Sequence, residues 1–271
     1  MGKITALAGN QRTLYQIDAF ADKVFSGNPA AVVPLENWLP EDTMQHIAME
    51  NNLSETAFIV KEGERFAIRW FTPTAEVDLC GHATLATAFV IFRYLEPDTQ
   101  EIEFDSRSGL LSVTRKGSKM RMDFPKDLPQ SLSKQKGEID GVIGGNTVAV
   151  MKGKDDILAI LATQLEVEKI RPDFGLMSKL DCRGLIVSAV GENYDFVSRC
   201  FYPNYGVNED PVTGSAHCLL APYWSEVLHK KTLNARQLSR RGGSLTCKVG
   251  ENRVYLSGTC VPYMIGKITL P

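Results

Sequence analysis

Two segments of the sequence place a glycine at the start of a predicted helix, next to residues that could bind an anion or move a proton. They are 78–84 (DLCGHAT) and 209–217 (EDPVTGSAH), with their glycines at Gly81 and Gly214. Glycine lets the backbone approach a ligand closely, and the unpaired N–H groups of a first helical turn attract negative charge. One such turn could simply begin a buried helix. Two at matching positions predict a carboxylate or phosphate site.

A carboxylate at Glu55 is the candidate acid or base. It lies in the otherwise uncharged stretch 51–60 (NNLSETAFIV), just before a predicted strand. Burial favours the protonated form of a carboxylate, which suits such a group to take a proton and return it elsewhere. An exposed residue at the start of a strand is the other interpretation of Glu55.

The sequence repeats itself. Segment 66–73 (FAIRWFTP) resembles 196–203 (FVSRCFYP) at an offset of 130, and Gly81 then matches Gly214 at an offset of 133. Further matches keep the second offset, among them Glu76 with Glu209. A run of matches that shares one three-residue insertion indicates two copies of one unit.

The boundary is expected near 125–137, which is rich in Pro, Lys and Ser. We therefore predict an N-terminal half, 1–127, that carries Glu55 and the CGHAT turn. The C-terminal half, 128–271, carries the EDPVTGSA turn.

Short runs of β-branched and aromatic residues predict the strands that would position these turns. Strands are expected at 13–20, 56–60, 66–71, 102–105, 109–115, 120–124, 147–150, 185–190, 196–202, 244–249 and 253–257. Helices are expected near 40–52, 82–92, 155–169 and 215–230, the last with Pro222 inside it, where we expect a kink or an end. The 82–92 segment is apolar or small nearly all round and should be buried on every side. The pattern predicts an α+β fold of two pseudo-symmetric, β-rich half-barrels, each wrapped around a central helix.

Composition excludes several classes of function. The 271 residues are 44% hydrophobic and carry a net charge of −2, which argues against a nucleic-acid binder. No apolar run is long enough for a membrane span, and the start of the chain is too polar for a signal peptide. Six scattered cysteines indicate reduced thiols in a cytoplasmic protein. The four histidines show no metal-ligand spacing, so no metal site is expected.

The sequence resembles the PhzF-like (phenazine biosynthesis-like) family, which has the diaminopimelate epimerase-like fold. The resemblance spans nearly the whole chain and rests on 25–33 (FSGNPAAVV), 52–58 (NLSETAF) and the two glycine turns together. It implies two pseudo-symmetric halves, a cytosolic homodimer and no cofactor. The family's type reaction is isomerisation by proton transfer on a small carboxylate, and many members have no known substrate.

The resemblance also implies roles for particular residues. Glu55 would be the catalytic acid/base, and the substrate would be surrounded by His82, Asp210 and Ser215, with Gly81 and Gly214 beside it. From the residues alone, the helix dipole at His82 should lower its pKa and favour the neutral ring. Asp210 and Ser215 could equally be helix caps. Asn28 is expected to fix its turn rather than contact substrate.

The related epimerases use two thiols, one before each paired glycine. This chain has Cys80 at the first position and Thr213 at the second, which disfavours racemisation by two thiols. The sequence thus predicts a cofactor-independent isomerase that acts on a small carboxylate. A non-catalytic small-molecule binding or protein-interaction module, and an amino-acid racemase or epimerase, are the alternatives.

Overall fold

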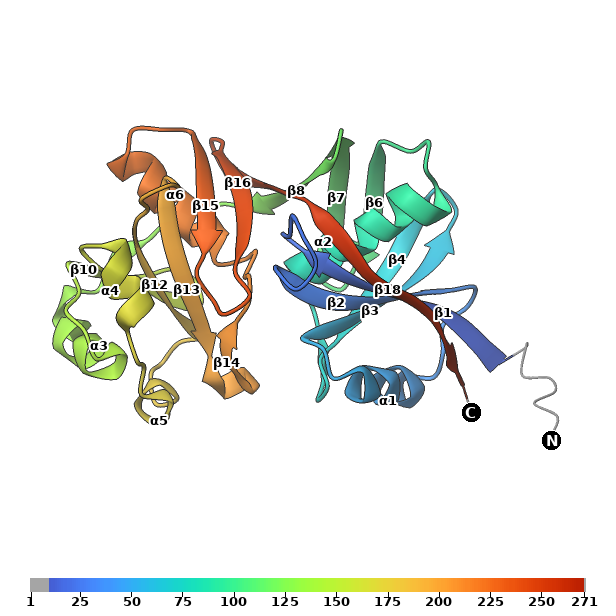
Figure 1. Cartoon of the computed structure of the whole chain (residues 1–271), viewed down its shortest axis with the longest axis horizontal. Helices are drawn as coiled ribbons and strands as arrows, with labels where there is room; N and C mark the ends of the chain where they lie inside the picture. The colour runs from blue at the N-terminus through green and yellow to red at the C-terminus, as the bar shows by residue number, and fades with distance from the viewer. Residues whose placement is uncertain (1–9, 271) are drawn as a thin grey trace.

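The computed structural model describes residues 10–270 and shows two β-rich halves side by side (Figure 1). The strands of the first half are β1 (Gln11–Ala19), β2 (Asn28–Leu35), β3 (Glu55–Glu62), β4 (Arg65–Phe71), β5 (Glu76–Val77), β6 (Glu101–Ser106), β7 (Gly109–Lys116) and β8 (Lys119–Pro125). Those of the second half are β10 (Ala149–Lys152), β11 (Asp156–Ile160), β12 (Gly184–Val190), β13 (Phe196–Tyr202), β14 (Val207–Asp210), β15 (Thr232–Gln237), β16 (Gly243–Val249) and β17 (Arg253–Gly258). A short strand β9 (Gln130–Ser131) and a long final strand β18 (Cys260–Thr269) complete the sheet.

The two halves have the same strand topology. In the first, β2 runs parallel to β3, β3 antiparallel to β4, and β4 parallel to β6, after which β6, β7 and β8 form an antiparallel meander. The second half repeats each of these pairings in the same order, with the strands β11, β12, β13, β15, β16 and β17. The internal repeat is therefore a structural duplication.

The strand register carries the same insertion as the sequence. Trp70 of β4 pairs with Val77, whereas Cys200 of β13, 130 residues later, pairs with Asp210, 133 residues after Val77. The longer connection in the second half includes a 3₁₀ turn at Pro203–Tyr205.

Matching ion pairs close this connection in both halves. Arg69 Nε donates to Glu76 at 2.6 Å, and Arg199 Nε donates to Glu209 at 2.7 Å. The offsets between these partners are the 130 and 133 of the sequence. The equivalences between the halves are thus fixed by side-chain contacts as well as by the backbone.

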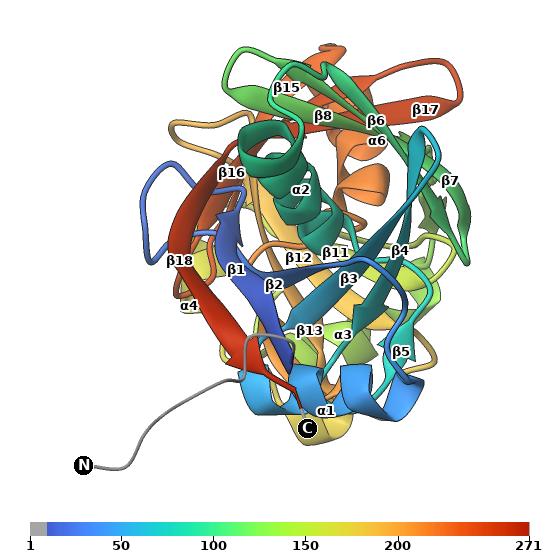
Figure 2. The same cartoon turned by 90° about the vertical axis from the view of Figure 1, so that its right-hand side faces the viewer.

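Each half folds around a central helix. Helix α2 (Gly81–Val90) has eight buried residues out of ten, and Figure 2 shows it inside the curve of the first half's strands. Helix α6 (His217–Val227) occupies the matching place in the second half and continues past Pro222. The remaining helices are α1 (Glu41–Asn51), α3 (Lys136–Ile143), α4 (Gln164–Lys169) and α5 (Phe174–Met177), and a π-helical turn at Ile91–Leu95 follows α2. Between residues 10 and 270, no helix is both long and apolar enough to cross a bilayer.

The helix expected at 155–169 is wrong for most of its length. Its first part is β11, whose five residues are all buried between β10 and β12. Helix α4 begins only at Gln164, where Thr163 and Glu166 form a capping box. A five-residue buried run has too few residues to distinguish a buried strand from a buried helix. The matching strand β2 of the first half was not predicted either.

Strand pairing and ion pairs join the two halves. Strand β8 pairs with β17, and β18 leaves the second half to pair with β1, as the long strand crossing Figure 1 shows. The final strand of the segment 128–271 thus lies on the first half. Arg241 of the second half donates to Asp18 of β1 at 2.8 Å, and the Asp18 side chain is only 3% exposed.

Arg241→Met should weaken the fold, because it leaves the Asp18 carboxylate buried without its cation. We expect a loss of about 2 kcal/mol or more in the free energy of unfolding by urea. Arg253→Met, which breaks the half-exposed pair with Asp123, should cost less than about 1 kcal/mol. The Arg241→Met loss should shrink at acid pH, where Asp18 becomes neutral. Equal losses for the two variants would contradict this role of Arg241.

Candidate active site

The two glycine turns meet at the junction of the halves. A Cβ atom added to Gly81 would lie 3.8 Å from the Cα of Gly214, and the reverse distance is also 3.8 Å. We call this approach the glycine contact. Helix α2 begins at Gly81 itself, whereas α6 begins three residues after Gly214 with Ala216 as its N-cap. Both helix starts therefore point to one region.

Glu55 and His82 lie together on the first half's side of the glycine contact. Glu55 begins β3, and His82 lies in the first turn of α2. Glu55 Oε2 is 3.1 Å from His82 Nε2, and the two side chains are 18% and 6% exposed. The contact is close but poorly aligned, so among the described residues neither atom has a hydrogen-bond partner. Buried polar atoms left in this state are rare and often mark a functional site.

The charge state expected for His82 is wrong. Burial acts to lower its pKa, but the neighbouring Cys80 and Glu55 act to raise it, and the net shift is upward, well above the ordinary value. Burial also raises the pKa of the Cys80 thiol, which leaves Cys80 neutral near pH 7. Glu55 is therefore the neighbour that can hold His82 as an imidazolium. The carboxylate comes from a strand, so a prediction from the helix dipole alone misses it.

Asn28 joins the two halves at this point. Its side chain is completely buried, and its amide nitrogen donates to Asp210 Oδ1 at 2.9 Å and to the Val212 carbonyl at 3.0 Å. The same nitrogen lies 3.2 Å from His82 Nδ1, and its oxygen accepts from the Ser54 hydroxyl at 3.1 Å. Asn28 thus does more than fix its own turn, which was the role expected from sequence.

Asp210 is the second half's main hydrogen-bond acceptor at the candidate site. It accepts from Asn28 and from the Thr213 hydroxyl, and Gln237 Nε2 donates to its backbone carbonyl at 2.7 Å. Burial is the main cause that raises the pKa of Asp210 to about 6, with His82 opposing it. Asp210 therefore changes charge close to neutral pH, which a helix cap on the surface would not do.

Ser215 makes no hydrogen bond to Glu55 or His82 in the described chain. Its hydroxyl oxygen accepts from Arg183 Nη2 at 3.2 Å, and Arg183 is in turn paired with the buried Asp156. The structure thus brings Glu55, His82 and Asp210 into one network through Asn28. Ser215 belongs to a second cluster beyond the glycine contact.

Cys80 and Thr213 occupy equivalent positions in the duplicated fold. The Cys80 carbonyl accepts from the Thr84 hydroxyl at 2.5 Å, and the Thr213 carbonyl lies 2.8 Å from the His217 ring four residues on. Cys80 Sγ is 3.5 Å from His82 Nδ1. The second position therefore holds a hydroxyl where a two-thiol enzyme would need sulfur.

One group of side chains in residues 10–270 has the composition of a metal site. Ligand atoms of Glu55, Cys80 and His82 lie within 4.8 Å of one another. Cys80 faces Nδ1 of the imidazole and Glu55 faces Nε2, however. A single ion could reach only one of these two nitrogens, so the three residues do not form one coordination shell as they stand.

Sequence reasoning missed the roles of Asn28, Gln237 and Arg183. Asn28 and Gln237 act on residues 182 and 27 positions away, and no local pattern marks such pairs. Arg183 was missed because its equivalence to the segment before Thr56 follows from strand pairing and not from the sequence offset of 130.

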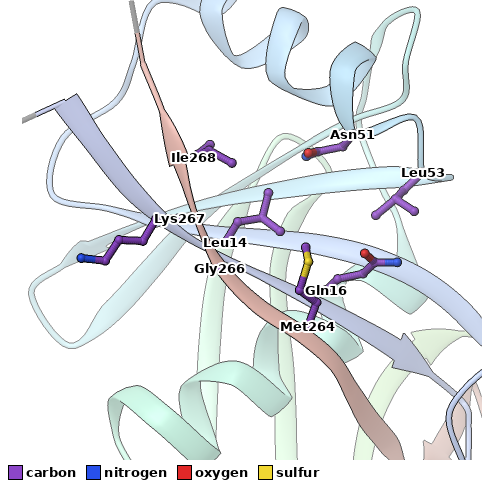
Figure 3. A pocket seen from close by; sticks show the side chains of 8 residues that line it. All are labelled: Leu14, Gln16, Asn51, Leu53, Met264, Gly266, Lys267 and Ile268. Atoms are coloured by element: carbon purple, nitrogen blue, oxygen red, sulfur yellow. The ribbon is translucent and has the colours of Figure 1, made fainter. Parts of the chain in front are cut away.

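A separate pocket of about 240 Å³ lies between β1, β18 and the end of α1 (Figure 3). Its lining includes Leu14, Gln16, Leu53 and Met264 and none of the predicted site residues. The chemistry-bearing groups are therefore not in this pocket.

The comparisons with known proteins agree with this architecture. The family model described as phenazine biosynthesis-like protein matches residues 17–266. Two Pseudomonas aeruginosa proteins, each named an uncharacterized isomerase, are 47% and 48% identical and cover 96% and 95% of this chain and 99% of their own lengths. The mouse phenazine biosynthesis-like domain-containing protein 2 is 40% identical over 94% of this chain and 98% of its own.

Solved structures show the same fold. A PhzF-family protein from Enterococcus faecalis is 50% identical, has a TM-score of 0.93, and is matched over 96% of this chain and 100% of its own. A hydroxyproline epimerase from Agrobacterium vitis has a TM-score of 0.61 at 9% identity, with 97% of this chain and 94% of its own covered, and shows the fold alone. The chain belongs to the phenazine biosynthesis-like (PhzF) family.

Proposed function

We propose that the protein is a cofactor-independent isomerase that moves a proton within a small substrate bearing a carboxylate. Glu55 removes the proton from carbon and returns it at another position. The related Pseudomonas proteins, which are named isomerases, support this class of enzyme. The substrate beyond its carboxylate is not specified by these residues.

The observation that carries the proposal is the state of Glu55 and His82. Their facing atoms, Oε2 and Nε2, are buried, 3.1 Å apart and not hydrogen-bonded within the described chain. A general base must be free to approach the proton that it abstracts. A substrate C–H placed against Oε2 would meet a carboxylate oxygen that accepts no hydrogen bond from the described chain, with the His82 imidazolium 3.1 Å away to stabilise its negative charge.

The glycine contact supports the binding half of the proposal. Negative charge that develops on a substrate carboxylate during proton removal needs donors aimed at it. Gly81 begins α2 and Gly214 lies three residues before α6, and neither glycine has a side chain to obstruct the backbone N–H groups at these helix starts. Loss of a proton next to a carboxylate would be stabilised there without a lysine.

A two-thiol racemase is disfavoured. Burial raises the pKa of Cys80, and Thr213 has no thiolate state. One base on one side of the glycine contact fits a proton shift better than inversion at a stereocentre. The homodimer and the cytoplasmic location implied by the resemblance stay predictions.

Glu55→Gln should abolish proton exchange. In D₂O, a panel of cyclic and amino-acid-like carboxylates is followed by NMR for deuterium incorporation with the wild-type protein. We expect the rate for an exchanging compound to fall by at least about 100-fold in Glu55→Gln, because the amide cannot accept the proton.

Glu62→Gln is the matched control, because Glu62 ends the same strand and is exposed. The Glu62→Gln variant should catalyse deuterium incorporation at the wild-type rate. Undiminished exchange in Glu55→Gln would overturn the assignment of the base. Carboxylates that raise the melting temperature but never exchange would identify a binding protein in place of an isomerase.

Asp210→Asn should change how stability depends on pH. The folded-state pKa of about 6 lies above the ordinary value of 3.8, so protonated Asp210 stabilises the fold at low pH, and this contribution is lost as the pH rises through 6. The unfolding free energy of the wild type, minus that of Asp210→Asn, should therefore fall between about pH 4 and pH 7.5.

Urea titrations across this range measure the difference. Asp22→Asn removes an exposed carboxylate and serves as the control. A difference that is constant or rises with pH would contradict the raised pKa of Asp210.

A further inference from the structure

The second half has no acid at the position that matches Glu55. Phe71 and Phe201 are equivalent residues 130 apart, and they pair with Thr56 and Leu185 respectively. The residue before Thr56 is Glu55, and the residue before Leu185 is Gly184. The duplication therefore replaces the candidate base by a residue without a side chain.

Tyr202 occupies the space that a side chain at Gly184 would need. A Cβ atom there would lie 2.2 Å from both Cδ1 and Cε1 of the Tyr202 ring. Tyr202 is 8% exposed, and within residues 10–270 its hydroxyl has no hydrogen-bond partner. A buried phenol donor left unengaged thus stands where the first half has a carboxylate.

Arg183 brings a positive charge to the same place. It precedes Gly184 as Ser54 precedes Glu55, and its side chain is 33% exposed. Asp156 holds it through two hydrogen bonds, to Nε at 2.9 Å and to Nη2, and the guanidinium lies 5.5 Å from the centre of the Tyr202 ring. Nη1 makes no hydrogen bond to any described residue, so its two N–H donors remain available.

Ser215 connects this cluster to the glycine contact. It follows Gly214 directly, as His82 follows Gly81, and its hydroxyl accepts from Arg183 Nη2 at 3.2 Å. The residue after each glycine therefore contacts the chain at or next to the start of the matching strand: His82 contacts Glu55, and Ser215 contacts Arg183, which is equivalent to Ser54. The first half contributes the candidate base and an imidazolium, and the second contributes a guanidinium and two hydroxyls.

We propose that Arg183, together with Ser215 and the Tyr202 hydroxyl, binds the anionic group of the substrate and so orients its reacting carbon towards Glu55. The ligand class is a small carboxylate, since a guanidinium presents N–H donors in the plane that a carboxylate needs. This inference rests on the proposed function for the role of Glu55. The role of Arg183 as an anion-binding residue can be tested without turnover.

A structural role for Arg183 would be limited to neutralising Asp156. That role uses Nε and Nη2 on one edge of the guanidinium and explains neither the unbonded Nη1 nor the unengaged Tyr202 hydroxyl. It predicts that loss of Arg183 lowers stability and leaves any selectivity for charged ligands intact. Binding selectivity therefore separates the two roles.

The experiment compares each charged probe with its neutral counterpart. Pyrrole-2-carboxylate and benzoate are titrated into the protein by calorimetry beside pyrrole-2-carboxamide and benzamide, which keep the ring and lose the charge. We expect Arg183→Met to weaken binding of a carboxylate by at least about tenfold and binding of the matching amide by less than about twofold. Arg183→Lys should recover part of the carboxylate affinity, and Tyr202→Phe should lose a smaller part.

Arg69→Met is the matched control, because Arg69 is also a half-buried arginine paired with a buried acid, Glu76. It should keep the preference for carboxylates over amides. Urea unfolding of each variant verifies that it is folded at the titration temperature. If Arg183→Met is not folded, the comparison is made with Arg183→Lys. Equal losses for acid and amide, no loss for either, or a wild-type protein that binds neither carboxylate would overturn the proposal.

Failure of this inference and failure of the proposed function give different results. If Glu55→Gln still exchanges deuterium but Arg183→Met loses carboxylate binding, Glu55 is not the base and Arg183 still binds the anion. If Glu55→Gln stops exchange while Arg183→Met binds carboxylates normally, the isomerase stands and this role of Arg183 is wrong.

Discussion

The site depends on the hydrogen bonds of a single buried carboxamide. Asn28 begins β2 of the first half, yet its nitrogen donates to Asp210 and Val212 of the second. Because a buried amide must satisfy its donors, separation of the halves here would leave them unpaired at a cost of about 1–3 kcal/mol each. The same nitrogen lies 3.2 Å from His82 Nδ1, so the residue that joins the halves also lies beside the imidazole that faces Glu55.

Duplication accounts for the frame of the site, and later divergence accounts for its chemistry. Strand pairings, central helices and the Arg–Glu pairs at 69–76 and 199–209 are preserved in both halves. Beside the glycine contact the copies differ: Cys80 is equivalent to Thr213, and His82 is equivalent to Ser215. A fold that builds two equivalent helix starts has thus acquired one that carries a base and one that does not.

The sequence predicted the parts of this arrangement that are periodic or repeated. Offsets of 130 and 133 identified the duplication, and the apolar segment 82–92 identified a central helix. Strand β11 was mistaken for a helix because a five-residue buried run has no period to measure. The direction of the His82 pKa shift was mispredicted because the helix dipole takes no account of Cys80 and Glu55, and Glu55 lies 27 residues away on another element. Asn28 shows the same limit, since its partners lie in the other half.

The asymmetry also bears on the stereochemistry available to the proposed base. Two bases on opposite faces of one carbon can invert it, since one removes the proton and the other delivers a new one. Here the residue of the second half equivalent to Glu55 is Gly184, with Tyr202 packed over it, and burial raises the pKa of that phenol well above the ordinary value. Such a phenol stays protonated and can donate a hydrogen bond but cannot act as a base. Under the proposed mechanism, a proton that Glu55 both takes and returns would move a double bond within the substrate and would not invert a centre.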